Sequence, residues 1–427
     1  MSSPTVLIIG CGIAGPVLAI LLKRKGYNPI VFEKVQALGD AGASLMIQPN
    51  GMKILNLIIP NRPFPTITPL QSLWHGTASG ETLGHSTLPS SYVDRYTQPA
   101  SGIKRSVLNL HLKTTLQEHG IPLYEGYQLE NIHEHANQVT ANFTNGESIT
   151  GSFLIGCDGI KSSTRNILLT HKAGIAEGPP TFTGLIQVAG ISKTPQSMAK
   201  RDISLSNWYG EGVHVVAYPI SAEDISWAVT IPDTEGEDST WRAATAGTEL
   251  ESLRGKLRER LSGFEDCVLE MINTADRIIS YGLFDRREVP AEQWFSDRVV
   301  LVGDAAHPTS PHLGQGANQA LVIRVGANVR LGREDCYHLC RMLPDLSLDE
   351  ANWGVAEQGL SGIFEEFARL RQPRTSILVR EARRLGEQRV VMGGPERCRE
   401  RDASIADAWK DEDAVARALD GLFREPF

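Results

Sequence analysis

Thr5-Val-Leu-Ile-Ile9, followed by Gly10-Cys-Gly12-Ile-Ala-Gly15 and Pro16-Val-Leu-Ala-Ile-Leu-Leu22, decides the fold. The Val/Leu/Ile run is short and lacks polar alternation, which is typical of a parallel strand buried on both faces. Gly10 and Gly12 permit a tight turn and a close approach of the backbone to phosphate, and Gly15 permits close packing of the next helix. The stretch therefore predicts a strand, a turn and a helix that bind a dinucleotide.

A carboxylate follows the second predicted strand. Pro29-Ile-Val-Phe32 is apolar and leads to Glu33, at a spacing that places the acid beside the ribose hydroxyls of a dinucleotide. Because a carboxylate would repel a 2′-phosphate, the ligand is NAD or the adenosine half of FAD rather than NADP. A signal peptide or membrane anchor is the alternative for residues 6–22, but three glycines interrupt that run and no basic segment precedes it.

The composition is that of a globular protein with more than one unit. At 427 residues the chain is too long for one ordinary core, so we expect about two or three compact units. Hydrophobic residues make up 41% and charged residues 22% of the chain, which is ordinary for globular proteins. A net charge of −8 gives no basic footprint for nucleic acid, and no other apolar run has membrane-spanning length. We expect a cytoplasmic protein with neither nucleic-acid partners nor a membrane span.

Six cysteines are scattered along the chain without the spacing of a disulfide framework, which favours a reducing compartment. Cys336-Tyr-His338-Leu-Cys340 contains atoms that could bind a metal. Cysteines four residues apart also form one buried stripe of a helix, and no second pair of ligands lies nearby in the sequence. We therefore interpret this segment as helix core and expect no metal site.

Strand patterns dominate residues 180–232, which include Val213-His-Val-Val-Ala-Tyr218-Pro and Ile225-Ser-Trp-Ala-Val-Thr-Ile231. Such a block is typical of a separate antiparallel sheet. Residues 233–275 become acidic and helical, and helical spacing with many charges continues from residue 363 onward. We therefore expect a second, β-rich unit and a helical C-terminal part.

Two further motifs follow predicted strands. Gly151-Ser-Phe-Leu-Ile-Gly156 leads into Asp158-Gly159-x-x-Ser162-x-x-Arg165, and Arg298-Val-Val-Leu-Val302 leads into Gly303-Asp304-Ala-Ala-His307-Pro. Together with the first glycine motif and Glu33, these motifs resemble, in order and spacing, those of group A flavoprotein monooxygenases. That family includes the para-hydroxybenzoate and salicylate hydroxylases and many fungal pathway oxygenases. The resemblance covers nearly the whole chain.

The resemblance implies an α/β fold of mixed α+β character. It has a Rossmann-like FAD-binding domain, an antiparallel-sheet substrate domain and a helical C-terminal part. The FAD-binding domain is expected to be discontinuous, because the motifs lie far apart in the sequence. The expected segments are 1–75, 101–178 and 281–345 for FAD binding, 76–100 and 179–280 for the substrate domain, and 346–427 for the C-terminal helices.

The resemblance also implies how the cofactor is held. Asp304 would accept a hydrogen bond from the ribityl chain of FAD, and Gly314-Gln315-Gly316 before a helix would stabilise negative charge on the reduced flavin. Arg105 would contact the pyrophosphate or ribityl region, with a surface helix-cap arginine as the alternative. Asp158 is linked in the family to FAD and to the nicotinamide cofactor. The expected FAD-binding residues are Gly10, Gly12, Ile13, Ala14, Gly15, Glu33, Lys34, Ala43, Arg105, Asp158, Gly159, Gly303, Asp304, Pro311, Gly316, Ala317 and Asn318.

The predicted substrate side carries a His-x-x-x-Tyr-Pro pattern at His214 and Tyr218. It resembles a pattern of phenol-hydroxylating relatives, in which such side chains orient and deprotonate the substrate. A phenolate is hydroxylated faster than a phenol, and histidine titrates near neutral pH. Residues four apart on a strand share one face, so packing on the sheet is the alternative. The expected catalytic residues are His214, Tyr218, Gly314, Gln315 and Gly316.

The function expected from the resemblance is monooxygenation of a small aromatic or polyketide-like molecule, by hydroxylation or epoxidation through a C4a-hydroperoxyflavin. FAD is the cofactor, O₂ and NADH or NADPH are co-substrates, and no second glycine motif binds the nicotinamide cofactor permanently. We expect a monomer or a homodimer. The alternatives are a flavin reductase or dehydrogenase on the same fold, or an inactive flavin-binding protein.

One stretch departs from the family pattern. After Leu321 the family continues directly with Glu-Asp, whereas here residues 322–333 precede Glu334-Asp335. The stretch contains two glycines and three arginines and no acid, and each glycine costs a helix interior roughly 1 kcal/mol relative to alanine. It is either a true loop or a translated intron, and we expect a break in the helix there.

Overall fold

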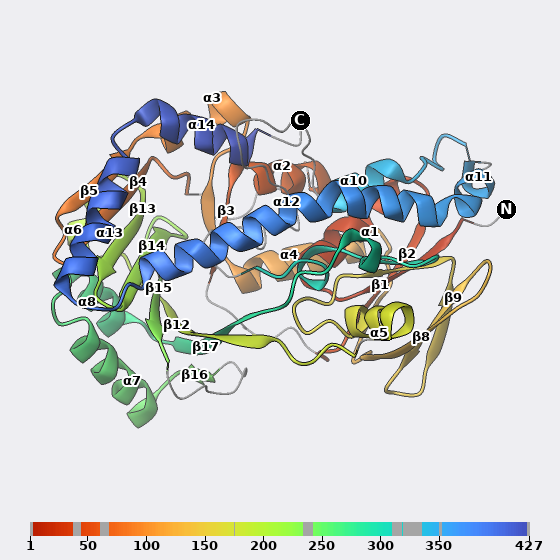
Figure 1. Ribbon diagram of the computed structural model, residues 1–427, viewed down its shortest axis with the longest axis horizontal. Helices are drawn as coiled ribbons and strands as arrows, with labels where there is room; N and C mark the ends of the chain where they lie inside the picture. The colour runs from red at the N-terminus through yellow and green to blue at the C-terminus, as the bar shows by residue number, and fades with distance from the viewer. Residues whose placement is uncertain are drawn as a thin grey trace.

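The computed structural model describes residues 3–36, 44–59, 68–174, 176–233, 242–309, 318, 335–349 and 352–424. Two main sheets lie at opposite ends of the molecule, and the long helix α12 (Leu360–Arg389) runs past both of them (Figure 1). This arrangement, with further helices at the C-terminal end, confirms the expected mixed α/β fold.

The first sheet is parallel, and its strands β1, β11 and β18 are buried on both faces. Its five strands lie in the order β18-β11-β1-β2-β7, and all neighbouring pairs are parallel. The apolar run at Thr5–Ile9 forms the central strand, as its lack of polar alternation predicts. The strands are β1 (Thr5–Ile9), β2 (Asn28–Glu33), β7 (Leu123–Glu125), β11 (Phe153–Gly156) and β18 (Val299–Leu301).

Helices from four parts of the chain pack around this sheet. Among them are α1 (Ala14–Arg24), α4 (Arg105–Glu118), α5 (Ser163–Ala173) and α10 (Asp335–Met342). Two small sheets flank it. They pair β3 (Ser44–Ile47) with β6 (Ser101–Lys104), and β8 (Leu129–Glu134) with β9 (Val139–Phe143) and β10 (Ser148–Gly151).

The second large sheet has eight strands in the order β16-β17-β12-β15-β14-β13-β4-β5. It is antiparallel, as expected, except that β4 pairs with β13 in parallel. The parallel pair arises because β4 and β5 belong to an early part of the chain, which leaves the FAD-binding domain and joins this sheet. The strands are β4 (Ser72–Thr77), β5 (Thr82–Ser86), β12 (Thr181–Lys193), β13 (Ser204–Gly210), β14 (Val213–Pro219), β15 (Asp224–Pro232), β16 (Arg242–Ala244) and β17 (Ile278–Asp285).

The two faces of this sheet differ in character. One face packs Trp208, Val215 and Trp227 against α7 (Gly247–Arg260) and α8 (Asp266–Thr274) in an apolar core. The other face carries a polar row in direct register across five neighbouring strands, since successive cross-strand partners lie side by side. The row is Tyr281, Gln187, Thr230, His214 and Tyr209.

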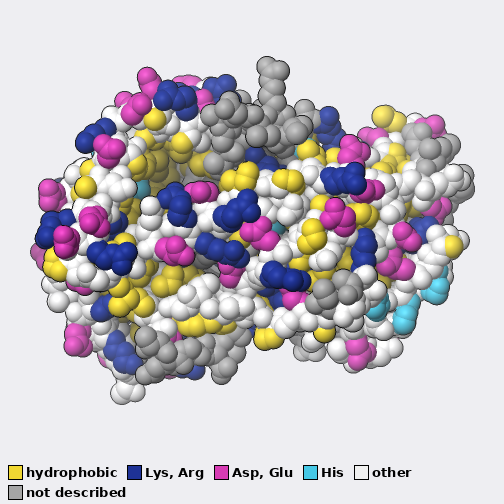
Figure 2. Space-filling view, viewed as in Figure 1, with side chains coloured by type: hydrophobic (Ala, Val, Ile, Leu, Met, Phe, Trp, Pro, Cys, Tyr) yellow, Lys and Arg dark blue, Asp and Glu magenta, His cyan; other side chains and the backbone are white. Residues whose placement is uncertain are grey.

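The C-terminal helices close the molecule along its length. Basic and acidic side chains mix on the surface over α12 (Figure 2), where Arg369 pairs with Glu365 at 2.7 Å and Arg384 with Glu381 at 2.9 Å. None of the helices in the described ranges is long and apolar enough to cross a membrane. The remaining helices are α2 (Pro49–Ile58), η1 (Leu88–Ser91), α3 (Tyr92–Tyr96), α6 (Gln196–Ala199), η2 (Ala291–Gln293), η3 (Gly303–Ala305), α11 (Asn352–Gln358), α13 (Pro395–Ala408) and α14 (Glu412–Phe423).

The expected segment boundaries can be placed beside the strands. Strand β4 begins at Ser72, before the boundary expected between residues 75 and 76, and β17 runs through the boundary expected after residue 280. The expected break at 322–333 lies outside the described residues. It stays a prediction, and deletion of 322–333 tests it: a higher melting temperature and tighter FAD binding would mark the stretch as a retained intron.

Candidate active site

Four adjacent strands of the parallel sheet deliver the sequence motifs to one edge. The glycine turn follows β1, Glu33 ends β2, Asp158 follows β11, and Gly303-Asp304 follows β18. Because carboxyl ends of parallel strands meet at one edge of a sheet, residues far apart in the sequence face the same region of space there.

In the glycine turn, Gly10 and Gly15 lie close to neighbouring backbone, whereas Gly12 faces open space. A Cβ on Gly15 would lie 2.0 Å from the carbonyl oxygen of Gly10, and a Cβ on Gly10, whose φ is +105°, would lie 2.4 Å from that of Cys157. A Cβ on Gly12 would meet nothing within 4 Å. Helix α1 begins at Ala14 after Ile13, with no acidic side chain in its first turn and no side-chain cap. Its first N–H groups are therefore available to an anion.

Glu33 is held against this turn. Its carboxylate accepts hydrogen bonds from the backbone N–H of Cys11 at 2.8 Å and of Val35 at 3.1 Å. The side chain is only partly buried, so an oxygen lone pair remains open to a ribose hydroxyl. The neighbouring Lys34 is exposed.

Asp158 is engaged by its own motif. The carboxylate accepts hydrogen bonds from the hydroxyl of Ser162 at 2.5 Å and from the backbone N–H of Thr164 at 3.0 Å. Burial raises the pKa of Asp158, and these hydrogen bonds oppose that shift. Gly159 adopts φ of +76° in the turn. The acid thus orders the start of α5, a structural task that the sequence did not reveal.

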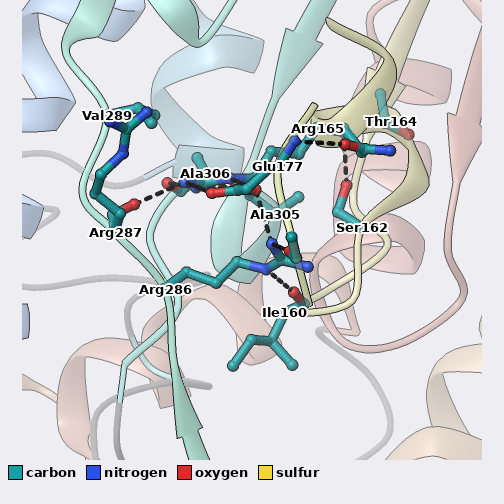
Figure 3. Close-up of polar contacts among 12 residues, drawn as sticks. Ile160, Ser162, Thr164, Arg165, Glu177, Arg286, Arg287, Val289, Ala305 and Ala306 are labelled. Atoms are coloured by element: carbon teal, nitrogen blue, oxygen red, sulfur yellow. Dashed lines mark hydrogen bonds and ion pairs between the residues drawn. The ribbon is translucent and has the colours of Figure 1, made fainter. Parts of the chain in front are cut away.

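Arg165, the last residue of the same motif, ties α5 to the turn after β18 (Figure 3). The side chain is fully buried, donates to the carbonyl oxygen of Ala306 at 2.8 Å and pairs with Glu177 at 2.7 Å. Arg286 also pairs with Glu177, at 2.8 Å. Sequence reasoning missed Glu177 and Arg286 because neither lies in a motif.

The turn after β18 presents Asp304 toward the site. Gly303 adopts φ of +64° and opens a short 3₁₀ turn. Within the described ranges, no group donates a hydrogen bond to the Asp304 carboxylate. Burial raises the pKa of Asp304, while His307 and Arg105 lower it. Arg105, the first residue of α4, is therefore close enough to influence Asp304, which favours a role in the site over a surface cap.

Asn318 is bonded to the backbone beside β3. It is fully buried, accepts a hydrogen bond from the backbone N–H of Gln48 at 3.0 Å and donates one to the carbonyl oxygen of Met46 at 2.8 Å. Its amide is therefore occupied by backbone groups around β3. The other expected residues of this region, Ala43, Pro311, Gly314, Gln315, Gly316 and Ala317, lie outside the described residues.

With this geometry in place, the comparison with known families is decisive. Residues 3–322 match the family described as FAD binding domain. The chain belongs to this family. The expected resemblance to group A flavoprotein monooxygenases and the expected cofactor, FAD, are confirmed.

Several curated relatives of this flavoprotein monooxygenase align over most of their length. The 3-amino-4-hydroxybenzoate 2-monooxygenase PtmB3 of Streptomyces platensis is 28% identical over 417 residues, which cover 96% of this chain and 94% of that protein. The salicylate hydroxylase of Pseudomonas putida is 27% identical over 402 residues, covering 89% and 85%.

Solved structures share the fold of the flavoprotein monooxygenase. The Klebsiella pneumoniae HpxO structure with FAD and uric acid has a TM-score of 0.75 at 21% identity, covering 97% of this chain and 96% of that one. A salicylate hydroxylase substrate complex has a TM-score of 0.73 at 23% identity, covering 100% of both chains.

The residues present fit FAD. The open space at Gly12 and the bare start of α1 suit a pyrophosphate, and Glu33 suits the adenosine ribose. Among the described residues no group donates to the carboxylate of Asp304, which is partly buried, and this carboxylate suits a hydroxyl donor such as the ribityl chain.

The two expected substrate residues lie on one face of the second sheet but in different surroundings. His214 is 1% exposed, bonds through Nε2 to the side-chain oxygen of Asn207 at 3.0 Å and lies against the Tyr209 ring. The Tyr218 hydroxyl is hydrogen bonded to the hydroxyl of Ser44 at 2.7 Å, beside β3 of the FAD-binding region. Tyr218 is therefore at the boundary between the eight-stranded sheet and the small β3-β6 sheet, whereas His214 is packed within its own sheet.

Proposed function

We propose that this flavoprotein monooxygenase hydroxylates a small aromatic molecule that lies on the polar face of the eight-stranded sheet. The observation that carries the proposal is a row of small side chains on that face. Ala189, Ala228 and Val216 are cross-strand neighbours, and Ala228 and Val216 are partly exposed although they lie on central strands. Small exposed side chains at the centre of a sheet leave room for a flat ring.

Polar groups border this row on both sides. Tyr218 and Ser226 are a cross-strand pair on one side, and the polar row of Gln187 and Thr230 lies on the other. Gln187 donates to the hydroxyl of Thr230 at 3.3 Å and accepts from that of Tyr281. A ring that carries hydroxyl or amino groups would find apolar contact beneath it and hydrogen-bond partners at its edges.

Tyr281 connects this face to the cofactor residues. Burial raises the pKa of Tyr281, Tyr218 raises it further, and Arg105 opposes the shift. Since Arg105 also influences Asp304, a single side chain lies near both the substrate face and the FAD-binding edge. This supports a substrate position on the face near the flavin that Asp304 is proposed to hold.

We assign separate tasks to Tyr218 and His214. A tyrosine phenol is ordinarily neutral near pH 7, and burial raises the pKa of Tyr218 further, so Tyr218 acts as a hydrogen-bond partner rather than as a charged base. Tyr218 then orients the substrate, and His214 shapes the adjoining wall through Asn207 and Tyr209. FAD, when bound, supplies the redox chemistry that takes a hydride from NADH or NADPH and one oxygen atom from O₂.

The relatives support an aromatic substrate with a hydroxyl group, since PtmB3 is named for an aminohydroxybenzoate and the Pseudomonas putida protein for salicylate. The test supplies hydroxylated benzoates and hydroxyquinolines with FAD, NADH or NADPH, and air. Product mass is compared with consumption of the nicotinamide cofactor. A gain of one oxygen atom per substrate supports the proposal. Reduction without oxygen gain identifies a flavin reductase or dehydrogenase, and no turnover on any ring substrate identifies a flavin-binding protein without this activity.

A further inference from the structure

A buried carboxylate lies behind the turn that carries Asp304. Asp335, the first residue of α10, is 0% exposed and bonds to three groups from two separate segments, the 303–307 turn and α12. Its Oδ2 accepts from the backbone N–H of Gly303 at 2.8 Å and from Nε2 of His307 at 2.6 Å. Its Oδ1 accepts from Nε of Arg371, in α12, at 2.6 Å. We call these four residues the Asp335 clamp.

The clamp keeps its carboxylate charged. Burial favours the neutral acid, but the adjacent His307 and Arg371 hold the pKa of Asp335 well below its usual range. Trp294 covers the imidazole of His307, with ring centroids 5.5 Å apart. A charged acceptor within a closed, low-dielectric setting makes strong and directional hydrogen bonds.

The Asp335 clamp holds one short turn, residues 303–307. Gly303 and His307 are the two ends of the segment that contains Asp304, and a single oxygen atom, Oδ2 of Asp335, holds both ends. Asp304 has no donor of its own within the described ranges, so nothing else there fixes its carboxylate. The clamp therefore holds both ends of the segment that carries Asp304.

We propose that Asp335 is a positioning residue for FAD: it fixes the 303–307 turn so that the carboxylate of Asp304 is presented to the ribityl chain. The proposal rests on the proposed role of Asp304. It adds a residue that lies beyond the matched family range of 3–322, and a partner, Arg371, from the C-terminal helical part.

The test measures FAD affinity of the apoprotein by flavin fluorescence, the visible circular dichroism of bound FAD, and the melting temperature of the apoprotein. Asp335→Asn keeps the shape but removes the charge. Because hydrogen bonds to a charged acceptor are worth about 1.5–3 kcal/mol, we expect roughly ten- to hundredfold weaker FAD binding and altered flavin dichroism. Asp345→Asn is the matched control, since Asp345 binds only its neighbour Ser347 among the described hydrogen bonds. It should bind FAD like the parent protein.

A double variant separates positioning from general stability. If Asp335 acts through Asp304, then Asp304→Ala combined with Asp335→Asn should bind FAD no more weakly than Asp304→Ala alone. His307→Gln leaves Gly303 and Arg371 bonded to Asp335 and should therefore weaken FAD binding less than Asp335→Asn does. If Asp335→Asn does not fold, His307→Gln replaces it in the test. Additive losses in the double variant, or unchanged affinity in Asp335→Asn, would overturn the proposal. Unchanged affinity in Asp304→Ala would instead overturn the assignment of Asp304.

Discussion

The two large sheets contribute to the site in different ways. The parallel sheet is mostly buried and contributes its carboxyl edge, where Gly10, Glu33, Asp158 and Asp304 follow or end four adjacent strands. The eight-stranded sheet buries one face against α7 and α8 and offers the other as a surface. An edge concentrates backbone N–H groups and turns, which suit phosphate and ribose. A face displays side chains in register, which suits recognition of a flat molecule.

This difference predicts that substitutions at the edge of the parallel sheet and on the face of the eight-stranded sheet affect different properties, FAD binding and substrate turnover. Changes at the edge should alter FAD binding, and changes on the face should alter substrate turnover while FAD stays bound. The predictions below are ordered from the largest expected effect to the smallest.

The largest effect is expected at the edge, for Gly15→Val. A Cβ at Gly15 would lie 2.0 Å from the carbonyl oxygen of Gly10, a backbone atom that cannot move aside as a flexible side chain can. We expect loss of FAD binding and little folded protein, measured by bound flavin and circular dichroism. Gly255→Ala in α7 is the control, because a Cβ there meets nothing within 4 Å. Normal FAD content in Gly15→Val would refute the described turn.

On the face, Tyr218→Phe should slow hydroxylation roughly a hundredfold, because a positioned hydroxyl is lost from the substrate site. FAD content should stay unchanged, since the ring and its packing remain. The measurement is kcat together with the absorbance of bound flavin, and Tyr124→Phe, at an exposed tyrosine, is the control. Loss of FAD with retained turnover would show that Tyr218 serves the cofactor rather than the substrate.

His214→Ala should act mainly on stability. Its imidazole is buried and bonded to Asn207, so removal leaves a cavity and a buried acceptor, at a cost of about 1–3 kcal/mol. We expect a lower midpoint in urea unfolding and a smaller loss of turnover than in Tyr218→Phe. If instead kcat falls roughly a hundredfold with unchanged stability, His214 is the catalytic base that the His-x-x-x-Tyr pattern suggests.

The last prediction concerns acid stability, and near neutral pH, where the other predictions are tested, its effect is the smallest. Burial lowers the pKa of His75 from 6.5 to about 3, so the folded protein keeps this imidazole neutral where the unfolded chain would bind a proton. Its contribution is fully present above pH 6.5 and is lost as the pH falls toward 3, at up to about 1.4 kcal/mol per pH unit. His75→Asn should flatten this part of the curve of unfolding free energy against pH. An identical slope in both proteins would contradict the shifted pKa.

The edge of the site could be predicted from sequence, and most of the face could not. Gly10, Gly12, Gly15 and Glu33 lie within one short stretch, where turn geometry and strand spacing dictate position locally. The polar row depends on strand register: Tyr281 and Gln187 meet only because β17 and β12 pair, although they are 94 residues apart in the sequence. A two-residue period shows which side chains share a face but not which strands are neighbours.

The same limit explains why the Asp335 clamp could not be predicted from the sequence. Asp335 was expected only as part of a resumed helix, and Arg371 lies in a charged helix whose pattern does not distinguish one buried arginine from the exposed ones. In the structure both are 0% exposed. Charged residues are almost never buried unless they are paired, so their burial became visible only with their partners in place.

The clamp also determines how this protein can be recombined with its relatives. A chimera joined after residue 322, where the family match ends, would keep Gly303 and His307 from one parent and take the positions of Asp335 and Arg371 from the other. A chimera joined after residue 349 would separate Asp335 from Arg371, and breaking a buried ion pair typically costs about 3–5 kcal/mol. The smallest exchangeable module therefore extends from the turn after β18 through the first half of α12.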